Sequence, residues 1–225
     1  MPSKPSLLFM LTFVAISLLE MIGDTLPITW LHYGCKPLIM GLLFWYSWKQ
    51  YRTIGYKSPA RWLMIGMVFA LLGDVFLMIR ELDLFAPGLG AFLVMQLCYS
   101  RAFWLSRQQH QAATNRWTWS YALPFVVYLG IFLAVLHPTF SQNPALKPLW
   151  WPVVLYAICL NTMGFLATQR QGLQGYRWVM IGALLFILSD SLIAIDKFLM
   201  PISGSTWLVM STYATAQYLI VIGIL

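Results

Sequence analysis

The sequence predicts an all-α fold, specifically a polytopic membrane helix bundle in which eight transmembrane helices form two parallel four-helix repeats. Three observations support this prediction. Of the 225 residues, 60% are hydrophobic and only 9% are charged, unlike the balance of a soluble globular domain. Apolar stretches of about 20 residues, the length that spans a bilayer, recur along the whole chain. Two of these stretches also resemble each other closely in sequence.

The first apolar stretch, 6–23, is predicted to stay as a transmembrane helix and not to be removed as a signal peptide. It contains Glu20 and is followed by Asp24, whereas a cleavage site requires small residues. Further along the chain, the 11 Trp and 11 Tyr residues fit aromatic belts at the membrane surfaces. The other transmembrane helices are expected, in order, at 36–52, 60–80, 86–106, 118–137, 149–168, 176–199 and 203–225.

The connections between these stretches are short and contain Pro, Gly and charged residues, which interrupt helices. None is long enough to hold a soluble domain. We therefore expect one transmembrane domain over 1–225, with a first repeat over about 1–110 and a second over about 111–225.

The distribution of Lys and Arg predicts the orientation of the helices, because short cytoplasmic loops are enriched in these residues. Nine lie on the side of the N-terminus: Lys4, Lys49, Arg52, Lys57, Arg61, Arg107, Arg116, Arg170 and Arg177. Four lie on the opposite side: Lys36, Arg80, Lys147 and Lys197. Both termini are therefore expected in the cytoplasm. Topology and anionic lipid headgroups account for the excess of basic residues, so the expected partners are membrane lipids and not nucleic acid.

The repeat is visible in RWLMIGMVFALLGD (61–74) and RWVMIGALLFILSD (177–190), which match at seven of fourteen positions without gaps. Their final aspartates, Asp74 and Asp190, are 116 residues apart, an interval that holds four helices. Because an even number of helices returns the chain to the side where it began, the two halves are predicted to be parallel repeats.

The two aspartates are expected at equal depth within the membrane. Thirteen residues of helix rise roughly 20 Å, which places both carboxyl groups toward the outer leaflet of a core about 30 Å thick. Glu20 should reach a similar level on the first helix. Small residues beside Asp74, namely Gly66, Ala70 and Gly73, should allow close helix contact, so this face is expected to point into the bundle.

Intramembrane carboxyl groups are costly, and they are either functional or paired with a partner. A structural role would be an ion pair, for example with Lys36, or a protonated Asp bonded to a backbone carbonyl. Two carboxyl groups in one low-dielectric site do not both ionise readily, so one retains its proton and the other acts as a base. This division suits cleavage of acetal-like C–O bonds and equally suits a proton-coupled transporter. A purely structural scaffold is a third interpretation.

Other reactive side chains give no recognisable motif. The three cysteines are widely spaced, and His32, His110 and His137 are expected in connections or at a helix end without metal-ligand spacing. We therefore expect no disulfide framework, metal site or cofactor.

A set of short motifs resembles the lysoplasmalogenase (YhhN-like) family over essentially the whole chain. Their order and spacing carry the resemblance: Lys36-Pro37-Leu38, Gly73-Asp74, Gly90-Ala91-Phe92 with Tyr99, Ser189-Asp190, and Tyr213 with Gln217. One departure is Gln96, where many family members have His. Glutamine orients water or a substrate oxygen but does not transfer protons, which puts an acid–base role at that position in doubt.

The resemblance implies a hydrolase of lipid metabolism that cleaves the vinyl ether bond of lysoplasmalogens, giving a fatty aldehyde and glycerophosphoethanolamine or glycerophosphocholine. It assigns catalysis to the aspartate dyad, Asp74 and Asp190. Candidate substrate-binding residues are Lys36, Glu20, Gln96, Tyr99, Tyr213 and Gln217. Lys36 would meet a lipid phosphate or hold one Asp ionised, or else extend to the membrane interface, and the others would alternatively make structural hydrogen bonds between helices.

The alternative function, a proton-coupled transporter or lipid carrier, would use the same intramembrane acids. Compact loops and the absence of targeting tails favour a bacterial cytoplasmic (inner) membrane, whereas a eukaryotic relative is expected in the endoplasmic reticulum.

Overall fold

The computed structural model describes residues 5–54, 58–79, 81–109 and 117–225, and over these ranges helices are the regular secondary structure and there is no strand. Eight α-helices are present in this part of the chain, together with short 3₁₀ turns at Trp119–Tyr121 and Lys147–Leu149. The α-helices are α1 (Leu7–Thr25), α2 (Thr29–Ile54), α3 (Ser58–Met78), α4 (Phe85–Gln109), α5 (Ala122–Gln142), α6 (Trp150–Thr168), α7 (Tyr176–Phe198) and α8 (Ser205–Ile224). The all-α prediction is confirmed.

Six of these helices are long and apolar enough to cross a membrane, counted over the described residues. They are α1, α3, α5 with its preceding 3₁₀ turn, α6 with its preceding 3₁₀ turn, α7 and α8. Helices α2 and α4 have the length but carry more polar and charged side chains, among them Lys36, Gln96 and Arg101. The chain is thus a multi-pass helical membrane protein.

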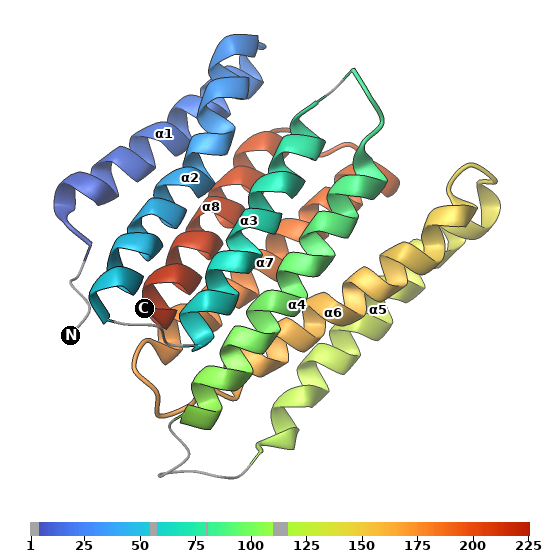
Figure 1. Ribbon diagram of the computed structural model, residues 1–225. Helices are drawn as coiled ribbons and strands as arrows, with labels where there is room; N and C mark the ends of the chain where they lie inside the picture. Colours follow the sequence, from blue (N-terminus) through green and yellow to red (C-terminus); the bar gives the residue numbers. More distant parts are fainter. Residues whose placement is uncertain (1–4, 55–57, 80, 110–116) are drawn as a thin grey trace.

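Two tightly packed helix pairs form the centre of the bundle: α3 with α4, and α7 with α8 (Figure 1). Glycines allow these close approaches. A Cβ atom at Gly73 would lie 2.7 Å from the Phe92 ring, and one at Gly182 would lie 2.8 Å from the Ala216 carbonyl oxygen. The expected packing of the small-residue face of α3 is therefore confirmed, and this packing orients the adjacent Asp74 into the bundle.

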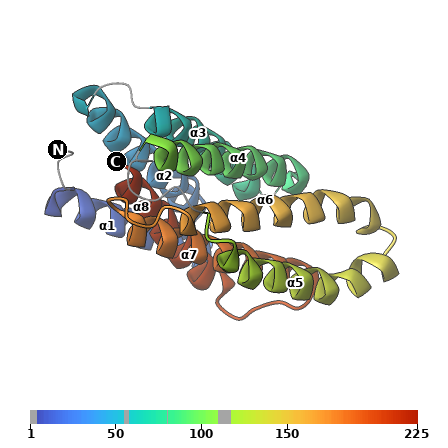
Figure 2. The same ribbon diagram turned by 90° about the horizontal axis from the view of Figure 1, so that it is seen from below.

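Helix α5 lies at the edge of the bundle and packs mainly against α6 (Figure 2). Its large apolar side chains, including Leu123, Val127 and Ile131, are exposed, as expected for a surface in contact with lipid tails. The start of α1 and the end of α8 lie at the same end of the bundle (Figures 1 and 2).

Helices α2 and α5 extend furthest beyond their predicted limits. Helix α2 begins at Thr29 and contains Pro37, so the expectation that His32 lies in a connection was wrong. Helix α5 likewise continues through His137 and Pro138 to Gln142. Proline is tolerated inside helices of membrane bundles because neighbouring groups satisfy the freed carbonyl. Several residues used in the sequence analysis lie outside the described ranges: Lys4, Lys57, Arg80, His110 and Arg116.

Arg170 follows α6 and is buried among helix ends, whereas the sequence predicts a cation in an exposed cytoplasmic loop. Its Nε donates to Ser106 Oγ at 2.8 Å and an Nη donates to the Gly223 carbonyl at 3.4 Å. Burial lowers the pKa of the guanidinium to about 10, which still leaves it protonated at neutral pH. Arg170 therefore ties the ends of α4, α6 and α8 together.

A matched pair of glycine substitutions tests this end of the bundle. Gly172 and Gly175 both adopt positive φ (81° and 71°), but a Cβ at Gly172 meets open space, whereas one at Gly175 would lie 2.1 Å from the Gly223 carbonyl oxygen. We expect Gly172→Ala to cost about 1–2 kcal/mol from backbone strain alone. Gly175→Ala should cost more than about 3 kcal/mol because two helices must also separate. Thermal unfolding in detergent compares them, and equal midpoints would contradict this packing.

Candidate active site

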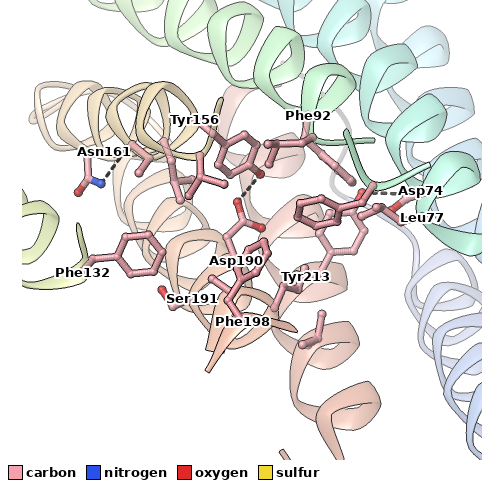
Figure 3. Close-up of a pocket in the computed structure, with 18 of the residues that line it drawn as sticks. Asp74, Leu77, Phe92, Phe132, Tyr156, Asn161, Asp190, Ser191, Phe198 and Tyr213 are labelled. Atoms are coloured by element: carbon pink, nitrogen blue, oxygen red, sulfur yellow. Dashed lines mark hydrogen bonds between the residues drawn. The ribbon is translucent and has the colours of Figure 1, made fainter. Parts of the chain in front are cut away.

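Asp74 on α3 and Asp190 on α7 line the same cavity (Figure 3). Both lie near the ends of their apolar helices that are remote from the matching Arg61 and Arg177. Asp74 is almost fully buried, and Asp190 is partly exposed. The two carboxyl groups singled out by the sequence repeat therefore face one internal space.

The cavity has a volume of about 100 Å³ and apolar walls with a few polar groups. Its apolar lining comes mainly from α4 to α8 and includes Phe85, Leu89, Phe92, Phe132, Val153, Leu160, Ala194, Phe198 and Met210. Its polar lining consists of Lys36, Asp74, Tyr128, Tyr156, Asn161, Asp190, Ser191 and Tyr213. An amphipathic cavity of this kind suits a ligand with both apolar and charged parts.

Each aspartate accepts a hydrogen bond from a tyrosine on another helix. Tyr213 Oη on α8 donates to Asp74 Oδ2 at 2.7 Å, and Tyr156 Oη on α6 donates to Asp190 Oδ2 at 2.6 Å. These short contacts fix the orientation of the carboxyl groups and leave the second oxygen of each for other partners.

Tyr156 was not predicted from the sequence as a residue of the site. The available signal was its position near the middle of the apolar stretch WWPVVLYAICLN, since tyrosines that serve as membrane anchors lie near helix ends. A tyrosine at mid-helix needs a hydrogen-bond partner inside the bundle, and here that partner is an aspartate.

Four of the six expected substrate-binding residues are fully buried and do not line the cavity: Glu20 on α1, and Gln96, Tyr99 and Gln217. Tyr99 Oη donates to Gln217 Oε1 at 2.7 Å, which joins α4 to α8. The Gln217 amide lies near Tyr213, and Gln96 lies near Tyr156. Gln96, Tyr99 and Gln217 thus form a layer behind the tyrosines that hold the aspartates.

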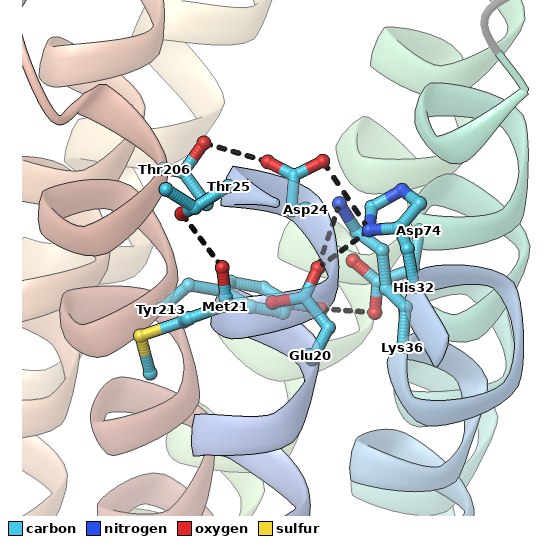
Figure 4. A network of polar contacts seen from close by, with 9 residues as sticks. All are labelled: Glu20, Met21, Asp24, Thr25, His32, Lys36, Asp74, Thr206 and Tyr213. Atoms are coloured by element: carbon cyan, nitrogen blue, oxygen red, sulfur yellow. Dashed lines mark hydrogen bonds and ion pairs between the residues drawn. The ribbon is translucent and has the colours of Figure 1, made fainter. Parts of the chain in front are cut away.

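Glu20 and Lys36 belong to a polar cluster beside Asp74, which includes the buried His32 (Figure 4). Glu20 Oε1 lies 3.2 Å from His32 Nδ1 and 3.7 Å from Lys36 Nζ. Asp24 Oδ1 also contacts His32 Nδ1, at 3.3 Å. Lys36 reaches the cavity, whereas Glu20 is enclosed behind it.

Helix α5 is linked to the site through Tyr128, whose hydroxyl lies 2.6 Å from Ser191 Oγ, next to Asp190. No group of three or more His, Cys, Asp or Glu side chains suited to a metal ion occurs within the described part of the chain. The arrangement offers two oriented carboxyl groups, one cation and several hydroxyl groups around an apolar space.

Comparison with known proteins places this arrangement in a family. The YhhN family model matches residues 31–224, which include both aspartates and both tyrosines. The chain belongs to the YhhN family. The resemblance of the short motifs is thereby confirmed as family membership.

Curated YhhN relatives carry consistent names. The proteins named lysoplasmalogenase TMEM86A from Bos taurus and Homo sapiens are each 31% identical over 192 residues, covering 83% of this chain and 74% of the relative. A lysoplasmalogenase from Mycobacterium bovis is 30% identical over 164 residues, covering 72% of this chain and 60% of the relative. No solved structure matches this chain.

Proposed function

We propose that this chain is a membrane-embedded lysoplasmalogenase, which hydrolyses the vinyl ether bond of lysoplasmalogens to a fatty aldehyde and glycerophosphoethanolamine or glycerophosphocholine. Membership of the YhhN family and the names of its relatives support this activity. The structural observation that carries the proposal is the pair of aspartates, each held by a tyrosine, on one amphipathic cavity.

The proposed chemistry is general acid–base catalysis by the two aspartates. One protonated carboxyl group, Asp74 or Asp190, transfers its proton to the vinyl carbon farther from the ether oxygen. The double-bond electrons form the new C–H bond, and the positive charge falls on the adjacent carbon and oxygen as an oxocarbenium ion. The other aspartate, ionised, stabilises this cation and takes a proton from the water that attacks the carbon. When the C–O bond of the resulting hemiacetal to the glycerol breaks, the first aspartate, now ionised, takes the hydroxyl proton and the second gives its proton to the departing glycerol oxygen. The aldehyde is released and both aspartates return to their starting protonation states.

The size of the cavity limits how the lipid binds. A volume of about 100 Å³ has room for the reacting end of the substrate but not for its whole hydrocarbon chain. We propose that the vinyl ether enters between the helices from the bilayer, that the tail stays along the apolar side chains of α4 and α5, and that the headgroup remains near Lys36.

The proposal extends to the membrane arrangement. In this scheme α2 and α4 also cross the bilayer, because they run alongside spanning helices and two of their polar residues, Lys36 and Gln96, face the bundle. Helices α1–α4 and α5–α8 would then be the two repeats, since α3 pairs with α4 as α7 pairs with α8. We further propose cytoplasmic termini and a bacterial inner membrane.

The test is release of aldehyde by the purified protein from a defined lysoplasmalogen. The matched control substrate is the saturated alkyl ether, which has the same headgroup and chain length but cannot form an oxocarbenium ion by protonation of carbon. We expect aldehyde from the vinyl ether only. Absence of aldehyde, combined with lipid uptake into liposomes driven by a pH gradient, would instead favour the transporter.

Hydrolysis in D₂O tests the site of protonation. The mechanism places one deuterium on the carbon next to the aldehyde, because the catalytic proton comes from solvent through an aspartate. Rapid reduction of the product to the alcohol followed by mass spectrometry should detect one added mass unit. An unlabelled product would contradict proton transfer to carbon.

A further inference from the structure

The geometry points to His32 as a positioning residue that controls Lys36, and to Lys36 as the group that binds the phosphate of the lipid headgroup. This inference deepens the proposed function and rests on it. It starts from a feature that the acid–base mechanism does not use, the cluster of Glu20, Asp24, His32 and Lys36 beside the cavity (Figure 4).

Glu20 Oε1 is shared between two basic side chains of α2. His32 Nδ1 lies 3.2 Å from this oxygen and Lys36 Nζ lies 3.7 Å from it. The Glu20 side chain is fully enclosed, so its charge must be balanced locally. Lys36 is the member of the cluster that also reaches the cavity, on the side of Asp74. The strength of the Glu20–His32 contact therefore determines how firmly Lys36 is held away from a ligand.

Asp24 fixes His32 from the other side. Its Oδ1 lies 3.3 Å from the same Nδ1 atom, and its Oδ2 accepts a hydrogen bond of 2.6 Å from Thr206 Oγ1 on α8. A single ring nitrogen thus faces two carboxylates that belong to α1. A neutral imidazole donates one proton from Nδ1, whereas an imidazolium carries a full positive charge that attracts both carboxylates.

The titratable and charged groups around His32 come from α1, α2, α3 and α8 and from the segment after α3. They are Glu20, Asp24, Tyr33, Cys35, Lys36, Asp74, Glu81 and Tyr213. Apart from His32, the only cation in this described set is Lys36, against four carboxyl groups. The charge state of His32 therefore determines whether the positive charge of Lys36 is needed to balance the carboxylates of the cluster.

The cluster has two states, because His32 and Lys36 compete to balance the charge of Glu20. With His32 neutral, Glu20 depends on Lys36 for charge balance and holds the ammonium group back. With His32 protonated, the imidazolium neutralises Glu20, and Lys36 is free to pair with an anion in the cavity. A lipid phosphodiester keeps one negative charge throughout this pH range, so its binding should strengthen as the pH falls through the titration of His32.

The experiment measures binding of the saturated alkyl-ether lysophosphatidylcholine, which is not hydrolysed and whose headgroup charge does not change with pH. For the unaltered protein we expect the Kd to be lower at pH 6 than at pH 8 by on the order of tenfold, the value of a charge-assisted contact. In His32→Asn, the amide keeps a hydrogen-bond donor near the Nδ1 position but does not titrate. The Kd of this variant should change less than about twofold over the same range.

Two further variants keep the test decisive. His137→Asn, an exposed histidine of α5, should retain the pH dependence. Lys36→Gln should weaken binding at pH 6, where the ammonium group otherwise pairs with the phosphate, and should remove the pH dependence. A pH dependence that persists in His32→Asn or in Lys36→Gln would overturn the inference. Because the probe lacks a vinyl group, this result is independent of aldehyde release, which tests the proposed function itself.

Discussion

Asp74→Asn and Asp190→Asn are each expected to lower kcat for aldehyde release by roughly 10²- to 10⁴-fold, the usual contribution of a general acid or base. Asparagine preserves the shape of the side chain and still accepts a hydrogen bond from Tyr213 or Tyr156. It neither donates a proton to carbon nor removes one from water. The measurement is single-turnover aldehyde formation from a defined vinyl ether lipid.

The matched control is Asp83→Asn. Asp83 is exposed, and its carboxylate accepts the backbone N–H of Phe85 at the start of α4, a position that asparagine also favours. We expect this variant to keep normal activity. If either cavity variant retained more than about a tenth of the activity, acid–base catalysis by that aspartate would be refuted, since the mechanism assigns each an essential proton transfer.

Tyr156→Phe and Tyr213→Phe should each lower kcat by roughly 10- to 100-fold and leave KM nearly unchanged, because they remove the group that orients a reacting carboxyl. The ring stays in place and continues to fill the cavity wall, so the fold should be kept. The double variant should lose more than either single one, because the two tyrosines serve different aspartates.

Tyr176→Phe provides the comparison for these tyrosines. The Tyr176 hydroxyl contacts the Met180 sulfur at the start of α7, away from the cavity, so this variant should behave like the unaltered protein. An increase in KM with constant kcat in Tyr156→Phe or Tyr213→Phe would show that the hydroxyl binds substrate and does not orient an aspartate.

Local sequence predicts the helices well because the bilayer imposes a simple requirement on each of them. A stretch of about 20 apolar residues forms its own backbone hydrogen bonds wherever its neighbours lie. The start of α2 shows the limit of this reasoning. Polar residues such as His32 are typical of a connection. The helix nevertheless includes His32, because Glu20 and Asp24 of α1 provide partners for its ring nitrogen.

The candidate site was predictable where the repeat indicated it, at the two aspartates, and where the family motifs did, at Lys36 and Tyr213, which both line the cavity. Asp74 and Asp190 occupy matched positions in two similar stretches, so their alignment needs no knowledge of packing. Tyr156 lies outside the two repeated stretches. Its role depends on α6 packing against α7, and Gln96 and Gln217, which were expected at the substrate, lie instead behind the tyrosines.

The amino-acid sequence alone predicts an all-helical membrane protein, the approximate limits of its helices, and the two intramembrane aspartates. These features depend on hydrophobicity and spacing within single segments. The packing of the helices is needed to show which tyrosine holds which aspartate, that Glu20 lies behind Lys36, and that His32 contacts Glu20. Those contacts connect residues up to 139 positions apart, and such pairs are fixed by how helices pack together, which no single segment encodes.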